Sequence, residues 1–70
     1  MTDEEIKAMQ KEVAGKKRVA SEWASRIHDL VEDRLFSDFH ELPELAAGTV
    51  KACEAWKQLR TELEQAGGKS

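Results

Sequence analysis

The sequence predicts an all-α protein, an antiparallel two-helix hairpin of the coiled-coil type that assembles into a four-helix bundle dimer or a higher oligomer. Three observations predict this fold class. Apolar residues recur at alternating spacings of three and four in both halves of the chain, a segment containing the single proline separates the halves, and 70 residues are too few to bury a large core. Self-association is therefore expected.

The first helix is expected over about residues 3–35. Thr2 or Asp3 can act as its N-cap, and Glu5 follows Thr2 at the spacing of a capping box. Polar residues interrupt the seam only at Lys16 and Arg34. Its apolar or small members are Ile6, Met9, Val13, Ala20, Trp23, Ile27 and Leu30.

The second helix is expected over about residues 43–66, after a turn at about 36–42 in which Ser37 caps a short segment. Pro43 favours the first turn of a helix, since it lacks the amide that a continuous helix would use. Gly67 and Gly68 end the helix and begin a short glycine-rich tail. The seam of this helix is Leu42, Leu45, Thr49, Ala52, Trp56, Leu59, Leu63 and Ala66.

Folding the chain back on itself predicts a register in which the two tryptophans meet. The expected layers are Lys16 with Leu63, Ala20 with Leu59, Trp23 with Trp56, Ile27 with Ala52, and Leu30 with Thr49. Two indoles in one layer need more width than a single seam provides, so they stack or reach into a second hairpin. The expected oligomer core is Trp23, Ile27, Leu30, Ala52, Trp56 and Leu59.

Composition and motifs exclude several classes of function. A net charge of −3 argues against a nucleic-acid partner, and no apolar run is long enough for a membrane span. The single cysteine, Cys53, has no intrachain partner and fits a small, partly buried packing position in a cytoplasmic protein. No catalytic or nucleotide-binding motif occurs, so the chain is expected to be no enzyme and to need no cofactor.

The end of the hairpin around the turn is expected to be strongly acidic. Residues 28–44 contain six acidic residues and one basic residue, Arg34, which gives a formal charge of −5, whereas the rest of the chain sums to +2. This end is either a merely solvated acidic surface or a docking site for a basic partner. The candidate partner-binding residues are Asp29, Glu32, Asp33, Asp38, Phe39 and Glu41.

A metal site is the weaker alternative at the same end. His28 and Glu32 are one helical turn apart, so both can reach one ion, and His40 in the turn could be a third ligand. Against this, His28 lies beside the seam and lacks the Glu-x-x-His spacing of di-iron bundles. A capping or surface role for these residues is favoured.

The stretch HDLVEDRLFSDFHELPELAAGTVKACEAW resembles a small family of Rop-like helical hairpins of unknown function that are encoded in bacterial nitrogen-fixation gene clusters. The residues that carry the resemblance are the HDLVED run at 28–33, Leu35, and the LPELA opening of the second helix at 42–46. The resemblance implies a cytoplasmic, non-catalytic accessory protein of nitrogenase.

Two hypotheses of function follow. The first is an oligomeric adaptor or chaperone that binds a nitrogenase component or a cofactor-assembly protein through the acidic turn end. The second is a small metal carrier or sensor that uses His28, Glu32 and His40. A purely structural bundle is the third option.

Overall fold

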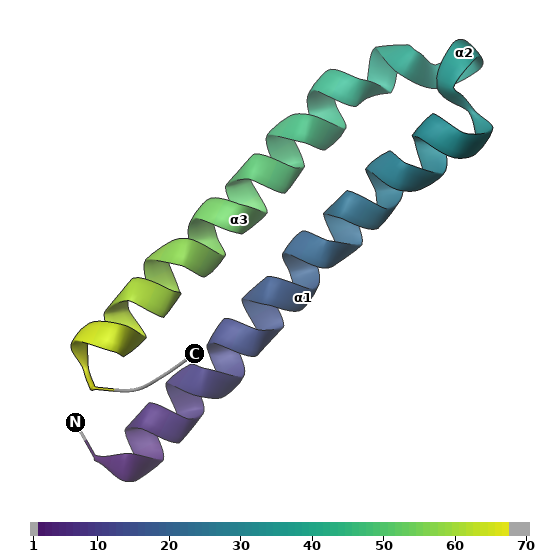
Figure 1. Ribbon diagram of the computed structural model, residues 1–70. Helices are drawn as coiled ribbons and strands as arrows, with labels where there is room; N and C mark the ends of the chain where they lie inside the picture. The colour runs from purple at the N-terminus through teal and green to yellow at the C-terminus, as the bar shows by residue number, and fades with distance from the viewer. Residues whose placement is uncertain (1, 68–70) are drawn as a thin grey trace.

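The computed structural model describes residues 2–67 and is an α-helical hairpin (Figure 1). Helix α1 (Asp3–Asp33) and helix α3 (Leu42–Gln65) lie antiparallel, side by side. The connection consists of the short helix α2 (Leu35–Asp38) and the 3-10 helix η1 (Phe39–Glu41). No strand occurs within residues 2–67. The predicted helical hairpin is therefore confirmed.

Helix α1 begins at the predicted N-cap Thr2, which forms one of the two hydrogen bonds of a capping box. The backbone N–H of Glu5 donates to the Thr2 hydroxyl oxygen at 3.2 Å, and that hydroxyl donates to the Glu5 carboxylate at 3.1 Å. Asp3, Glu4 and Glu5 place negative charge in the first turn, where the helix dipole favours it. The start of α1 is thus stabilised by local contacts alone.

Helix α1 ends at Asp33, before the predicted end near Leu35, because Arg34 leaves the helical conformation at φ −135° and ψ 16°. The Arg34 carbonyl accepts hydrogen bonds from the Asp38 amide at 2.8 Å and from the Ser37 hydroxyl at 3.3 Å. The prediction that Ser37 caps the following segment is wrong, since its hydroxyl instead satisfies a carbonyl behind it. The predicted turn is in fact two short helical segments.

Helix α3 begins and ends close to its predicted bounds. Pro43 lies in its first turn, where a missing amide costs no helical hydrogen bond. Gly67 follows the last turn with φ +90°, a conformation that glycine adopts more readily than other residues. The predicted end at Gly67 is confirmed, while Gly68 and the rest of the predicted tail lie outside the described residues.

The core of the hairpin is a thin stripe between α1 and α3. Val13, Leu30 and Leu63 are the buried hydrophobic residues among residues 2–67. The remaining apolar seam residues of both helices are only half-buried, which matches a seam open on two sides. They are Ile6, Met9, Ala20, Trp23, Ile27, Leu42, Leu45, Ala52, Trp56, Leu59 and Ala66.

The predicted register is wrong by one heptad. The indole of Trp23 lies against Gly48, so close that a Cβ atom on this glycine would stand 2.5 Å from the ring. On the predicted register Trp23 would lie level with Trp56, which is about 12 Å from Gly48 along the helix axis. If α3 is shifted by seven residues relative to α1, Trp23 lies level with Gly48. Seam positions then still face seam positions, because the heptad pattern repeats every seven residues.

This register separates the two tryptophans instead of stacking them. Trp56 lies beside Lys17 and Ala20 of α1, roughly 10 Å along the axis from the level of Trp23. Each indole thus faces small residues of the opposite helix: Gly48 accommodates Trp23, and Ala20 lies beside Trp56. Gly48 is needed for close packing within one hairpin, and no oligomer is required to explain it.

Candidate partner-binding surfaces

Five of the six acidic residues of the turn end form two groups that differ in how they are neutralised. In the first group, the Arg34 guanidinium lies 3.1 Å from the carboxylate of Asp38 and 3.9 Å from that of Glu41. Asp38 is the more buried of the two carboxylates. Arg34 therefore pairs with two carboxylates, and these ion pairs help to hold α2 and η1 in place.

The second group belongs to the last turns of α1 and has weaker partners. His28 Nδ1 lies 3.7 Å from the Glu32 carboxylate and 4.0 Å from that of Asp29, and all three side chains are exposed. No ion pair within residues 2–67 joins Asp29, Glu32 or Asp33 to a lysine or arginine. The carbonyl end of a helix disfavours anions, so these carboxylates gain nothing from their position.

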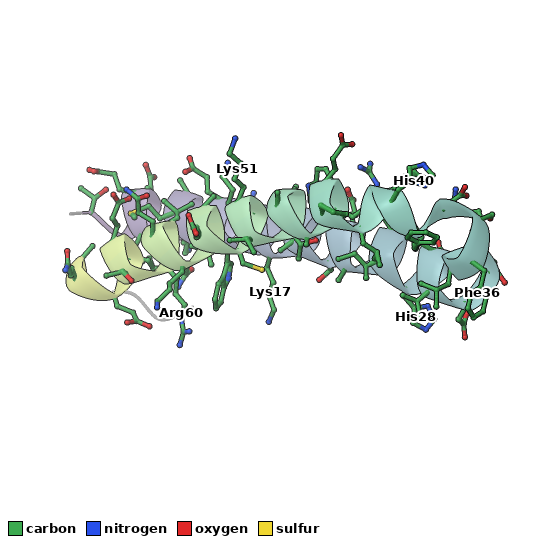
Figure 2. All side chains as sticks on the ribbon, turned by 90° about the horizontal axis from the view of Figure 1, so that it is seen from above. Lys17, His28, Phe36, His40, Lys51 and Arg60 are labelled. Atoms are coloured by element: carbon green, nitrogen blue, oxygen red, sulfur yellow. The ribbon has the colours of Figure 1, made fainter. Side chains whose placement is uncertain are left out.

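Phe39 lies apart from this second group. It is 58% exposed, and its ring makes an edge contact with the imidazole of His40, with ring centroids 6.3 Å apart. Figure 2 shows His40 and His28 projecting from opposite sides of the hairpin. Phe39, which lies beside His40, is therefore on a different side of the hairpin from Asp29 and Glu32, which lie beside His28.

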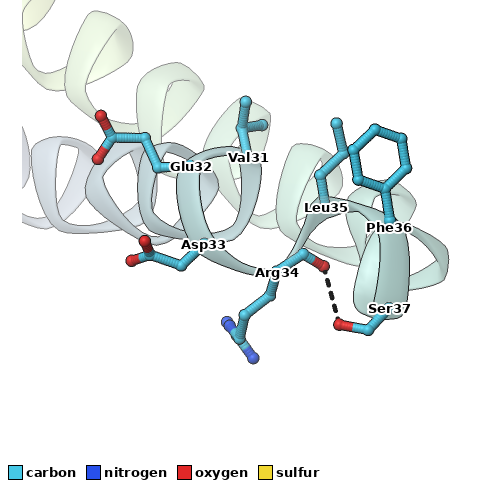
Figure 3. Close-up of a pocket in the computed structure, with 7 residues that line it drawn as sticks. All are labelled: Val31, Glu32, Asp33, Arg34, Leu35, Phe36 and Ser37. Carbon is cyan, nitrogen blue, oxygen red and sulfur yellow. Dashed lines mark hydrogen bonds between the residues drawn. The ribbon is translucent and has the colours of Figure 1, made fainter.

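Phe36 is the residue that sequence reasoning missed. Its side chain is 92% exposed, the largest exposure among the large hydrophobic residues described. With Val31, Leu35 and four polar neighbours it lines a shallow pocket of about 240 Å³ (Figure 3). The signal in the sequence was a phenylalanine off the heptad seam of both helices, three residues after the end of α1.

The third candidate metal ligand, His40, is not near the other two. His28 and Glu32 lie near each other, but His40 projects from the other side (Figure 2). Across residues 2–67, no three histidine, cysteine, aspartate or glutamate side chains gather where they could hold one ion. Two exposed ligands on one helical turn form an incomplete site for a structural metal.

A second surface lies on one flank of the hairpin, midway along the rod. Here the small side chains of Ala20 and Ala24 border a pocket of about 280 Å³ together with Thr49, Cys53 and Trp56. An adjoining pocket of about 310 Å³ extends past Trp56 to Val50. The expectation that Cys53 is partly buried is wrong for the single hairpin, because Cys53 is exposed on this flank.

The chain was compared with known families, curated proteins and solved structures. The model of a family described as Rop-like matches residues 4–67. No curated protein and no solved structure shows a significant match. Among the helices that residues 2–67 form, none combines the length and the apolar character needed to cross a bilayer.

Proposed function

The chain belongs to the Rop-like family, whose helical hairpins dimerise, and we propose that it acts as a dimeric, non-catalytic adaptor or chaperone in nitrogen fixation. Its client is a nitrogenase component or a cofactor-assembly protein in the cytoplasm. Acidic residues of the turn end bind the client, and the flank around Trp56 binds a second copy of the chain. A four-helix bundle dimer results.

The shape and surface of the hairpin support dimerisation. It is a rod with extents of 51 × 15 × 12 Å and a radius of gyration of 15.5 Å, whereas a compact domain of this length has about 11 Å. Its accessible surface is 5407 Å², about 1,000 Å² more than a monomer of 7.9 kDa usually has. A second hairpin on the apolar flank would remove this excess.

The uncompensated acidic group at the end of α1 is the observation that carries the proposal. Asp29, Glu32 and Asp33 are placed where the helix dipole disfavours them, and no lysine or arginine of the described chain pairs with them. Placement that lowers the stability of the helix is understandable if a basic partner surface approaches this end. Such charges mainly raise the association rate and select the partner.

The process is inferred from sequence resemblance. The HDLVED run at 28–33 and the LPELA opening of α3 at 42–46 resemble Rop-like hairpins of nitrogen-fixation gene clusters. Both segments flank the turn, which is also where the acidic residues lie. An adaptor of this kind alters its client only through a difference in affinity for two client states, such as cofactor-deficient and mature.

The experiment is affinity purification of the tagged protein from nitrogen-fixing cells kept anaerobic. We expect a nitrogenase component or assembly protein to co-purify, and to be lost when Asp29, Glu32 and Asp33 are replaced by Asn, Gln and Asn. The matched control replaces Asp3, Glu4 and Glu5 in the same way, since it removes equal charge from the other end of α1. Equal recovery by both variants would contradict the proposed surface.

The alternative function, a metal carrier or sensor, keeps one supporting observation, the 3.7 Å approach of His28 to Glu32. Calorimetric titration of the metal-free protein with iron, nickel, zinc and molybdate tests it. Saturable binding that His28→Ala abolishes would favour this alternative over the adaptor.

A further inference from the structure

Phe36 occupies a position that the stability of the hairpin does not explain. It follows the first residue of α2 and leaves 92% of its surface in solvent, although the hairpin has few buried apolar side chains. Burying a phenylalanine contributes about 1.5–3 kcal/mol. The fold forgoes this contribution at Phe36, while its neighbour Leu35 is half-buried.

The surroundings of Phe36 combine apolar and acidic character. Figure 3 shows the side chains of Val31, Leu35 and Phe36 pointing to one side of this segment, and those of Asp33 and Arg34 pointing to the other. Val31 is itself 48% exposed. Glu32 and Asp33 also line the pocket, together with Arg34 and Ser37. An exposed aromatic ring near carboxylates that pair with no lysine or arginine of the described residues is the composition of a binding hot spot with a charged rim.

The charges indicate what such a surface would bind. Arg34 is engaged by Asp38 and Glu41, so the net charge around Phe36 is set by Glu32 and Asp33 and is negative. A complementary surface therefore presents an apolar socket for one aromatic ring, bordered by lysine or arginine. A second copy also presents cations, at residues 16–18 near the middle of α1, and the tests below distinguish it from a partner protein.

We propose that Phe36, with Val31 and Leu35, is the anchor of a docking surface for a partner protein that presents an apolar socket bordered by lysine or arginine, with Glu32 pairing to those cations. This inference rests on the proposed adaptor function and deepens it. It places the docking surface on the side of the turn that carries His28 and Phe36, and assigns Phe39 no part in it (Figure 2).

The first test is site-specific photo-crosslinking in nitrogen-fixing cells. The benzophenone amino acid p-benzoyl-phenylalanine replaces Phe36, and a matched variant carries it at the exposed position Ala47 of α3. We expect position 36 alone to crosslink to another protein, in a segment with apolar residues flanked by lysine or arginine. Crosslinks only to a second copy of this chain, or to acidic segments, would overturn the proposal.

The second test measures affinity for the crosslinked segment, prepared as a synthetic peptide. We expect Phe36→Ser to weaken binding by at least about tenfold, and Phe36→Leu to retain most of it, because the socket is apolar. Glu32→Gln should weaken binding and reduce its dependence on salt. Ala47→Ser is the matched surface control. Unchanged affinity of Phe36→Ser would overturn the proposal.

The two proposals fail separately. A crosslink to a basic apolar segment of a protein unrelated to nitrogen fixation supports the docking surface and overturns the proposed process. Co-purification of a nitrogenase component with no crosslink from position 36 overturns the docking surface and leaves the adaptor function in place. Since Phe36 is almost fully exposed, its variants should fold, and circular dichroism checks this.

Discussion

The middle of the hairpin and its turn end differ in whether their residues lie where they stabilise the fold. In the middle, the seam positions other than Lys16 are apolar or small, Trp23 lies against Gly48, and the seam hydroxyl of Thr49 donates to the Leu45 carbonyl at 2.8 Å. At the turn end, Phe36 is exposed, and carboxylates stand where the dipole of α1 disfavours them. The middle is arranged for stability, whereas Phe36 and the carboxylates at the end of α1 are not.

This difference indicates which residues to assign to folding and which to binding. A residue whose position stabilises the hairpin needs no partner to explain it. A residue whose position lowers the stability of the hairpin, or leaves apolar surface in water that could be buried, needs another explanation. At the turn end that explanation is recognition of a partner. Substitutions in the two regions should therefore affect stability and binding in opposite proportions.

The largest effect is expected in the seam. Leu30→Ala should lower the free energy of unfolding by about 2–5 kcal/mol, because Leu30 has no exposed surface and its truncation leaves a cavity. Its neighbour Val31 is 48% exposed, so Val31→Ala should stay within about 0.5 kcal/mol of the parent. Urea denaturation at one protein concentration measures both, and equal effects would contradict the assigned core.

The next effect separates two glycines of the long helices. Gly48→Ala should destabilise by about 1–3 kcal/mol, since its Cβ atom would overlap the Trp23 indole. Gly15→Ala should stabilise by about 1 kcal/mol, because nothing lies within 4 Å of the added atom and alanine favours the helix. Thermal unfolding measures both. If Gly48→Ala stabilises the protein once Trp23 is replaced by Leu, the clash with Trp23 is the cause of the destabilisation by Gly48→Ala.

A smaller effect is expected at the start of α1. Thr2→Ala should lower stability by about 1 kcal/mol, because the Glu5 amide loses its acceptor. Thr2→Ser keeps that acceptor and serves as the control. Chemical denaturation of the three proteins decides the point, and an equal loss in both variants would show that the cap hydrogen bond is not responsible.

The smallest effect for a single residue has a sign that tests the comparison directly. Neutralising Asp29, Glu32 and Asp33 should raise stability at low salt, by about 0.3–1 kcal/mol for each charge at most, since the dipole disfavours anions there. Neutralising Asp3, Glu4 and Glu5 should lower it for the same reason. Melting temperatures at low and high salt provide the measurement. If both triple substitutions change the stability in the same direction, the helix dipole is not the cause.

Local sequence was sufficient to predict the two long helices, the start of α1 and, closely, both limits of α3. The N-cap at Thr2, the heptad spacing, Pro43 in a first turn and Gly67 at positive φ each act within a few residues, so their consequences can be inferred without a fold. The lopsided charge was equally visible. What the sequence predicted correctly depended on short-range rules.

Only the tertiary structure decided the register, the separation of the tryptophans and the two sides of the turn. A heptad pattern shifted by seven residues still pairs seam with seam, so periodicity cannot distinguish the register with Trp23 at Trp56 from the one with Trp23 at Gly48. The path of the short helical connection makes that choice. The same path exposes Phe36 and turns His40 away from His28, which no helical spacing could predict (Figure 2).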